Sequence, residues 1–202
     1  MEAEPLDCMR SQWAGQGKTT LMPRAPKILP DYLPMRPDIL FVGINPGTYS
    51  AQQGHYYARL TNRFWWALHA AGLVPLPLSP REDCRVVEFG LGLTDLVKRP
   101  TNSAAQVRGD EFAVGRQALA AKIRRIEPLI VCFNGLTGYR QFFREHTHPG
   151  RQTRRLGRAR VFVLPSTSAR NAAYPRDVIL TYFQDLKAFR DALQRDSGRK
   201  EE

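Results

Sequence analysis

Apolar residues occur along this chain in short continuous runs, separated by longer stretches with helical spacing. Four runs stand out, at residues 39–44, 89–97, 129–133 and 161–164. They are continuous rather than alternating, as in strands whose two faces are both covered by other elements. We therefore expect four buried strands in a mainly parallel sheet.

The segments between these runs carry apolar residues at intervals of three and four, which is typical of amphipathic helices. One helix is expected to begin near Asn62, a good N-cap residue, and to end near Gly72. Others are expected over residues 110–126, after Gly135 and over residues 176–193. This alternation predicts an α/β fold, a three-layer αβα sandwich around a short, mainly parallel central sheet.

The 202 residues suit one domain with an arm in front of it. Residues 1–36 mix proline, polar and charged residues without a sustained period, which predicts a loosely structured N-terminal arm. Residues 37–195 are predicted to form the folded domain, and residues 196–202 a polar tail.

One short motif in the arm suggests a different class of protein. Residues 15–19, Gly-Gln-Gly-Lys-Thr, are similar to the end of a phosphate-binding loop. Gln12 stands where that loop needs its first glycine, and no strand is predicted before it. A nucleotide-binding ATPase stays an alternative, which deletion of residues 1–30 would test.

The charge balance points to a polyanionic partner. Thirty Lys and Arg residues against nineteen Asp and Glu residues give a net charge of +11. Seven arginines and a single acidic residue, Glu145, lie between Arg144 and Arg170. A nucleic acid fits this pattern, because basic side chains that neutralise phosphates release counterions. A merely basic protein would show the same total charge.

Other classes are disfavoured by what the sequence lacks. The longest apolar run is too short to cross a bilayer, and no secretory signal opens the chain, so we expect no membrane contact. A bacterial cytoplasm, near the nucleoid, is the expected location, and a nuclear one would leave a similar sequence. The three cysteines, Cys8, Cys84 and Cys132, are scattered and too few for an iron–sulfur cluster. No metal or cofactor is expected.

Polar residues follow each apolar run, at the points where the predicted strands end. They begin at Asn45, Asp95, Asn134 and Pro165. Ligands of parallel sheets bind beyond the carboxyl ends of the strands. We therefore expect these four loops to converge on one site.

The residues of these loops carry a resemblance to a known family. The segment Gly-Ile-Asn-Pro-Gly at residues 43–47 resembles the first motif of the mismatch-specific uracil/thymine DNA glycosylases, a branch of the uracil-DNA glycosylase superfamily. Residues 62–65, 92–101 and 165–171 resemble three later segments of that family, in the same order. The resemblance spans residues 38–193 and implies base excision repair, in which a flipped uracil is cut from its sugar.

The resemblance also implies roles for residues of the pocket. Asn45 would position the attacking water, aided by the backbone near Thr48, although an Asn that only builds the turn would look the same. Tyr57 would stack on the flipped base, and the backbone of Ile44 would read its edge. Ser50 would lie beside the C5 position of the base. A structural role for the Tyr57 ring remains open.

Contacts with DNA follow from the same resemblance. Arg170 would fill the space left by the flipped nucleotide, or bind a phosphate. The other DNA contacts are assigned to Asn62, Ser166, Ser168 and Ala169. The implied partner is double-stranded DNA that holds uracil or a mismatch, with single-stranded DNA as a further candidate, and the expected state is a monomer.

Two residues depart from the family pattern. Asp95 stands where relatives usually carry an amide or a basic residue, and we hypothesise that it is a general base or stabilises the sugar cation. An ion pair with Lys98 or Arg99, or a loop cap, is the structural alternative. Tyr49 is bulkier than expected, which leaves the shape of the pocket open.

Competing functions come from within the superfamily and from outside it. The main rival among enzymes is a single-strand-selective or an iron–sulfur uracil glycosylase, and the small number of cysteines counts against the second. A catalytically weak or inactive protein of the same fold, which binds DNA damage, is the alternative from another class. The presence of both Asn45 and Tyr57 favours an active enzyme.

Overall fold

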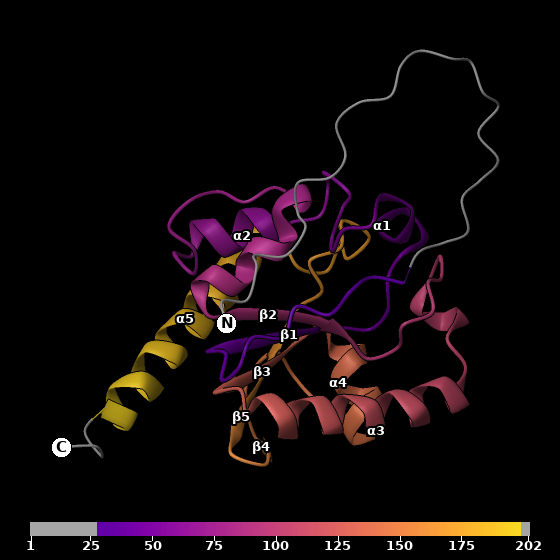
Figure 1. Ribbon diagram of the computed structural model, residues 1–202. Helices are drawn as coiled ribbons and strands as arrows, with labels where there is room; N and C mark the ends of the chain where they lie inside the picture. Colours follow the sequence, from indigo (N-terminus) through magenta and orange to yellow (C-terminus); the bar gives the residue numbers. More distant parts are fainter. Residues whose placement is uncertain (1–27, 199–202) are drawn as a thin grey trace, which may run out of the picture.

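A five-stranded sheet forms the centre of the protein in the computed structural model, which describes residues 28–198 (Figure 1). The strands lie in the order β2-β1-β3-β5-β4; β4 is antiparallel to β5, and the other pairs are parallel. Their bounds are β1 (Ile39–Gly43), β2 (Leu91–Asp95), β3 (Ile130–Asn134), β4 (Gly150–Leu156) and β5 (Ala159–Leu164). The prediction of an α/β fold with a mainly parallel sheet is confirmed.

Helices cover both faces of this sheet and make three layers (Figure 1). One face carries α2 (Phe64–Ala70) and α5 (Arg176–Gly198), and the other carries α3 (Gly109–Ile126) and α4 (Leu136–Phe143). The connections hold α1 (Thr48–Gln53) and the 3₁₀ segments η1 (Pro80–Phe89) and η2 (Ala104–Gln106). Among the described helices, none combines the length and apolar character needed to cross a membrane.

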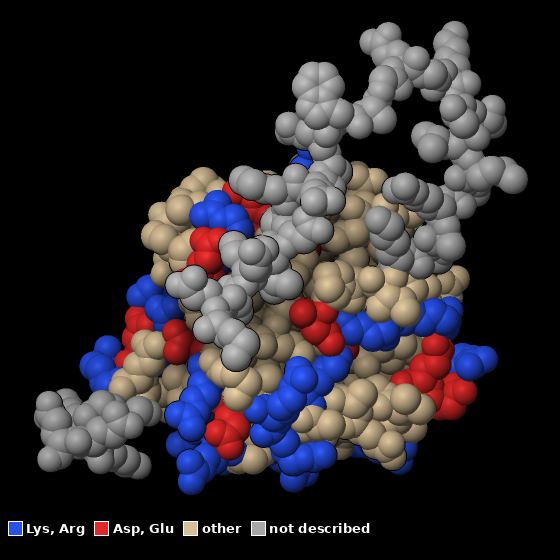
Figure 2. Space-filling model, in the orientation of Figure 1, with Lys and Arg blue, Asp and Glu red and all other residues tan. Residues whose placement is uncertain are grey.

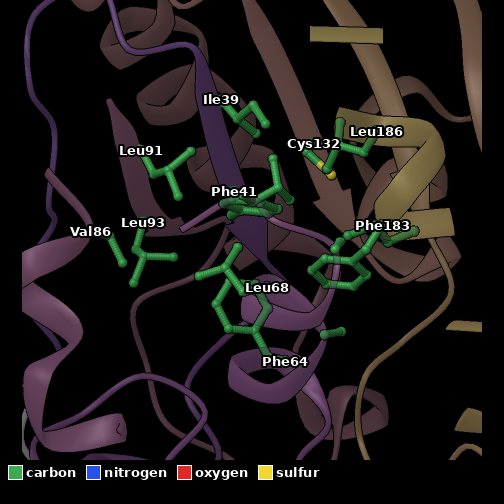
Figure 3. Close-up of a cluster of buried hydrophobic side chains, with 14 of the residues drawn as sticks. Ile39, Phe41, Phe64, Leu68, Val86, Leu91, Leu93, Cys132, Phe183 and Leu186 are labelled. Atoms are coloured by element: carbon green, nitrogen blue, oxygen red, sulfur yellow. The ribbon is translucent and has the colours of Figure 1, made fainter. Parts of the chain in front are cut away.

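The continuous apolar runs of the sequence result from burial on both faces of the sheet. In β1, Ile39 and Phe41 pack into the cluster under α2 and α5, whereas Leu40 and Val42 pack against the α3 and α4 side. The ring of Phe41 meets Phe64 of α2 edge to face, with centroids 5.2 Å apart (Figure 3). Neither face of the strand is left for water, so no polar alternation appears.

The folded domain begins earlier than the sequence indicated. Leu29 is buried, and Tyr32 exchanges two backbone hydrogen bonds of 2.9 Å with Leu93 of β2. Because β2 is the edge strand on this side, its free backbone groups can accept such a partner. Residues 28–36 therefore pack on the domain. Residues 1–27, which include the Gly-Lys-Thr segment, lie outside the described residues.

The antiparallel strand β4 has no counterpart among the predicted strands. It lies at the edge of the sheet and is largely exposed, so its sequence carries arginines where a buried strand carries apolar residues. Arg154 of β4 pairs with Glu145 at 2.7 Å, and Arg151 stacks on Phe189 at 4.5 Å. Figure 2 shows Lys and Arg side chains gathered over this hairpin and the adjoining end of α3.

Candidate active site

A cavity of about 750 Å³ opens at the carboxyl ends of the parallel strands. It is lined by the loops that follow β1, β2, β3 and β5, as the parallel topology predicts. The structure brings all the predicted site residues to this cavity: Ile44, Asn45, Thr48, Ser50, Tyr57, Asn62, Asp95, Ser166, Ser168, Ala169 and Arg170.

The side-chain amide of Asn45 is held in one orientation. Its nitrogen, Nδ2, donates to the Thr101 hydroxyl at 2.8 Å, to the Arg99 carbonyl at 3.0 Å and to the Pro46 carbonyl at 3.2 Å. With the nitrogen committed to acceptors of the protein, the oxygen Oδ1 is the end of the amide that remains for a ligand. An amide oxygen is an acceptor, so it suits a water or a hydroxyl group.

Asp95 ends β2 as a buried carboxylate. The residue is 4% exposed, and its oxygen Oδ2 has no hydrogen-bond partner among the described residues. Burial raises the pKa of Asp95 from 3.8 to about 7, and the charge of Asp31 acts in the same direction. Lys98 and Lys122 oppose this rise in pKa. A carboxylate with this pKa can bind and release a proton near neutral pH.

The basic residues next to Asp95 in sequence are paired elsewhere. Lys98 forms an ion pair with Asp31, whose other oxygen bonds Lys122 at 2.6 Å. Arg99 is bound to Glu111 at 2.6 Å. The ion pair with Lys98 or Arg99, considered above as a structural role for Asp95, is therefore absent from the described residues. Its carboxylate faces the cavity instead.

Tyr57 is held in an unusual backbone conformation, with φ of +50°. The preceding residue is fixed on both sides, because the Tyr56 amide donates to Asp83 at 2.8 Å and the Tyr56 carbonyl accepts from Trp65 at 3.2 Å. The Tyr57 ring stacks on Phe64, with centroids 4.1 Å apart and planes 29° apart. This stack supports one face of a half-buried ring that lines the cavity.

The Tyr57 hydroxyl is the second buried polar atom without a hydrogen-bond partner among the described residues. Burial, followed by the charge of Asp95, raises the pKa of Tyr57 well above its usual range, so the hydroxyl stays protonated. A donor and an acceptor that both lack partners thus lie at one cavity. Buried polar groups are rarely left unpaired in proteins, which points to a ligand.

The small polar residues of α1 are already bonded to the protein. The Thr48 hydroxyl donates to Asn102 at 2.6 Å, and its backbone amide donates to Thr101 at 3.2 Å. The Ser50 hydroxyl accepts from the Ala58 amide at 3.2 Å. These bonds fix the loop that carries Asn45, so a structural contribution of both residues is clear from the contacts.

The late loop, residues 165–175 between β5 and α5, lines part of the cavity. The Arg170 guanidinium donates to the Asn102 carbonyl at 2.7 Å, which joins the loop after β5 to the loop after β2. Within the late loop, the hydroxyls of Ser166 and Ser168 accept backbone amides. Arg170 must leave Asn102 before it can enter a DNA helix.

Arg63 was not among the predicted site residues, yet it organises this late loop. Its guanidinium donates to four backbone carbonyls, those of Thr167, Ser168, Asn171 and Tyr174, at distances of 2.6–3.3 Å. A forked, planar donor can satisfy several acceptors at once. Asn62 beside it accepts the Phe64 amide at 3.0 Å and so starts α2.

Asn134, at the end of β3, also binds the late loop. Its side-chain oxygen accepts the Thr167 amide at 3.2 Å, and its nitrogen donates to the Thr167 hydroxyl at 3.0 Å. The loop position after β3 had suggested Asn134 as a site residue, but not this pairing. Among the described residues, no group of three or more His, Cys, Asp or Glu side chains could hold a metal ion.

Comparisons with known proteins agree with this geometry. The family model described as the uracil DNA glycosylase superfamily matches residues 30–193. Among solved structures, the chain is similar to a solution NMR structure from Methanosarcina acetivorans, provisionally described as a uracil DNA glycosylase. That similarity has a TM-score of 0.55 at 20% identity, and covers 80% of this chain and 98% of the other, so it speaks for a shared fold.

Proposed function

This chain belongs to the uracil DNA glycosylase superfamily, and from that premise we propose that it is a monofunctional DNA N-glycosylase of the mismatch-specific uracil/thymine branch. Its proposed substrate is uracil in DNA, above all in G·U mismatches. Hydrolysis of the N-glycosidic bond leaves an abasic site for base excision repair. The motif at residues 43–47 and the segment at residues 165–171 support the branch assignment.

One observation carries the proposal: the buried carboxylate of Asp95, whose oxygen Oδ2 has no hydrogen-bond partner among the described residues, lines the same cavity as the oriented amide of Asn45. In the proposed reaction, Asn45 Oδ1 accepts a hydrogen bond from a water and directs it at the anomeric carbon. As the bond between that carbon and uracil N1 breaks, its electron pair leaves with the base. The water oxygen bonds the sugar, and Asp95 takes the proton that the water loses.

The pocket can also bind the base that leaves. Tyr57, supported by Phe64, offers a ring face to stack on a flipped pyrimidine. The Ile44 carbonyl already accepts the Val97 amide at 2.8 Å. The backbone N–H of Ile44 is therefore proposed as the group that binds the edge of the base. Ser50, whose hydroxyl is bonded to the Ala58 amide, has a small side chain that would leave room for some substitution at C5 of the base. A single methyl group changes binding by only about 1–3 kcal/mol, so the pocket would separate uracil from thymine weakly.

Binding to DNA is proposed to use the charge of the chain and its late loop. A net charge of +11 favours a polyanion, and Arg170 lies at the cavity mouth. Released from Asn102, Arg170 could occupy the gap in the helix while Ser166 and Ser168 contact phosphates. A single chain contains every residue of the proposed site, so a monomer is proposed.

Single-turnover cleavage of labelled oligonucleotides tests the proposal. Wild type, Asn45→Ala, Asp95→Asn and Asp95→Ala would be compared on G·U, A·U and G·T duplexes and on single-stranded uracil, with abasic sites revealed by alkali. Asp110→Asn is the matched control, because it removes a carboxylate that is 68% exposed. We expect the Asp95 variants to lose about 10²–10⁴-fold in rate, as for a missing general base.

The outcomes separate the candidates. Cleavage that needs Asn45 but not Asp95 would assign the chemistry to water positioning alone. Equal rates on the G·U and A·U duplexes would remove the mismatch preference. If folded wild-type protein binds these duplexes and cuts none of them, the chain is a damage-binding relative and the enzymatic proposal is wrong.

A further inference from the structure

A tight turn at residues 59–62 presents an apolar side chain to water. The Asn62 amide donates to the Arg59 carbonyl at 2.8 Å, which closes the turn. Leu60 follows Arg59 in this turn and is 94% exposed, more than any other large hydrophobic residue described. Isolated surface leucines are common, so the exposure alone assigns nothing, and the position of the turn matters.

The turn is part of the cavity rim. The cavity lining includes Arg59, Thr61 and Asn62. Leu60 therefore has residues of the cavity wall immediately before and after it in the sequence. The Arg59 guanidinium lies over the Tyr49 ring, 4.7 Å from its centroid. The flanks of Leu60 are therefore anchored to the walls of the cavity, while Leu60 itself points to solvent.

The same rim carries the late loop. Arg63 follows the turn directly, and its backbone amide donates to the Thr167 carbonyl at 3.0 Å. Its side chain holds four carbonyls of that loop, so the turn with Leu60 and the loop with Arg170 are fastened into one piece. Residues of both segments line the cavity to which a duplex would present a nucleotide.

We propose that Leu60 is a second, apolar wedge, which enters the base stack beside the nucleotide that turns into the cavity while Arg170 fills the gap from the other loop. The inference rests on the proposed function, since its partner is a DNA duplex. Apolar side chains inserted between base steps unstack them and kink the helix. A leucine that moves from water into a base stack is worth roughly tenfold or more in binding, which offsets part of the cost of unstacking.

Arg63 helps to fix the backbone that carries Leu60. A side chain that must enter between two bases gains most when its backbone is already fixed. Arg63 contributes to this, because the backbone of the turn and the backbone of the late loop cannot separate without breaking hydrogen bonds of 2.6–3.3 Å. The apolar wedge and the charged wedge are thus expected to act together.

The test compares Leu60→Ala with Leu60→Met, which keeps a large apolar side chain, and with Val114→Ala. Val114 is the matched control, since it is 67% exposed on α3 and is absent from the cavity lining. Stopped-flow fluorescence of 2-aminopurine placed beside the uracil records unstacking whether or not the base is cut. Single-turnover cleavage of the same uracil in duplex and single-stranded DNA is measured in parallel.

We expect Leu60→Ala to lose roughly tenfold in duplex cleavage and most of the fluorescence rise, to keep its rate on single-stranded uracil, and to be rescued by Leu60→Met. Leu60→Ala that unstacks the duplex as fully as Val114→Ala overturns the wedge, and so does an equal loss on both substrates. A third outcome separates the two proposals. If wild type unstacks the duplex, Leu60→Ala does not, and wild type cuts no substrate, the proposed function is wrong and the wedge is supported.

Discussion

Gly43 and Asp95 are partners in the register of the parallel strands β1 and β2, and the carboxylate of Asp95 lies against the α-carbon of Gly43. A β-carbon on Gly43 would overlap Asp95 Oδ1 and would lie 3.7 Å from the Tyr57 hydroxyl. The glycine that opens the first motif therefore makes room for the group that we propose as the base. The space between the strands is shaped for that carboxylate.

Gly43→Ala should consequently displace Asp95 while the fold persists. We expect a loss of about 1–3 kcal/mol in the free energy of unfolding from overpacking, and a larger effect on single-turnover cleavage, because the carboxylate leaves its place. Gly109→Ala is the control, since a β-carbon there meets nothing within 4 Å. Gly43→Ala with wild-type cleavage would show that the exact place of Asp95 does not matter.

The fold was largely predictable because its strands are covered on both faces. The runs that became β1, β2, β3 and β5 are apolar throughout, and burial demands that of them. β4 escaped prediction because an exposed edge strand needs no apolar residues, and its arginines suggested only charge. The packing of Tyr32 against β2 was also missed, because a pairing by backbone atoms leaves no periodic signal.

In the candidate site, the positions of the residues were predictable from the sequence, but their hydrogen-bond and ion-pair partners were not. The positions of Asn45 and Asp95 followed from strand ends and motif, since parallel strands bring their carboxyl ends together. The partners of these residues did not follow. Arg63 binds carbonyls more than a hundred positions along the chain, and Asp31 draws Lys98 away from its neighbour Asp95. Such pairings depend on tertiary contacts, which spacing along one sequence does not reveal.

The rate of cleavage should depend on pH through Asp95. Burial raises the pKa of Asp95 to about 7, and a general base acts only when ionised. Below that pH the single-turnover rate, measured at low enzyme concentration, should rise about tenfold per pH unit and then level off. Asp95→Asn should be slow and flat over the same range. A wild-type rate that is constant between about pH 5 and 8 would contradict the assignment.

The same carboxyl should make the protein less stable as pH rises. Its pKa is about 7 when folded and 3.8 in its usual state, so the folded protein holds the proton more tightly. Stability from this group therefore falls between these two pH values and is constant above about 7. Asp95→Asn does not titrate, so its stability relative to wild type should rise by roughly 2–3 kcal/mol from pH 5 to pH 8, which is about 5–10 °C in Tm. Thermal unfolding of both proteins at pH 5 and pH 8 checks this. A difference in Tm between Asp95→Asn and wild type that is the same at the two pH values would contradict it.

Arg63 should control the late loop more than the rest of the fold. Arg63→Ala removes the donors to four carbonyls of residues 167–174, so amide exchange there should speed up, with a loss of about 1–3 kcal/mol in the free energy of unfolding. Arg63→Lys lacks the fork and should rescue only part. Duplex cleavage should fall more than cleavage of single-stranded uracil, because only the duplex must be opened by that loop.

A matched control for this last experiment is Arg85→Ala, which removes one arginine that is ion-paired with Glu82 and Glu88 on the surface of η1. Surface pairs of this kind contribute about 0–1 kcal/mol, so both exchange and cleavage should stay near wild type. Hydrogen exchange measured by mass spectrometry shows which segments of the chain exchange faster in each variant. If Arg63→Ala slows duplex cleavage while exchange over residues 167–174 is unchanged, Arg63 acts on DNA directly and its role as a clamp is wrong.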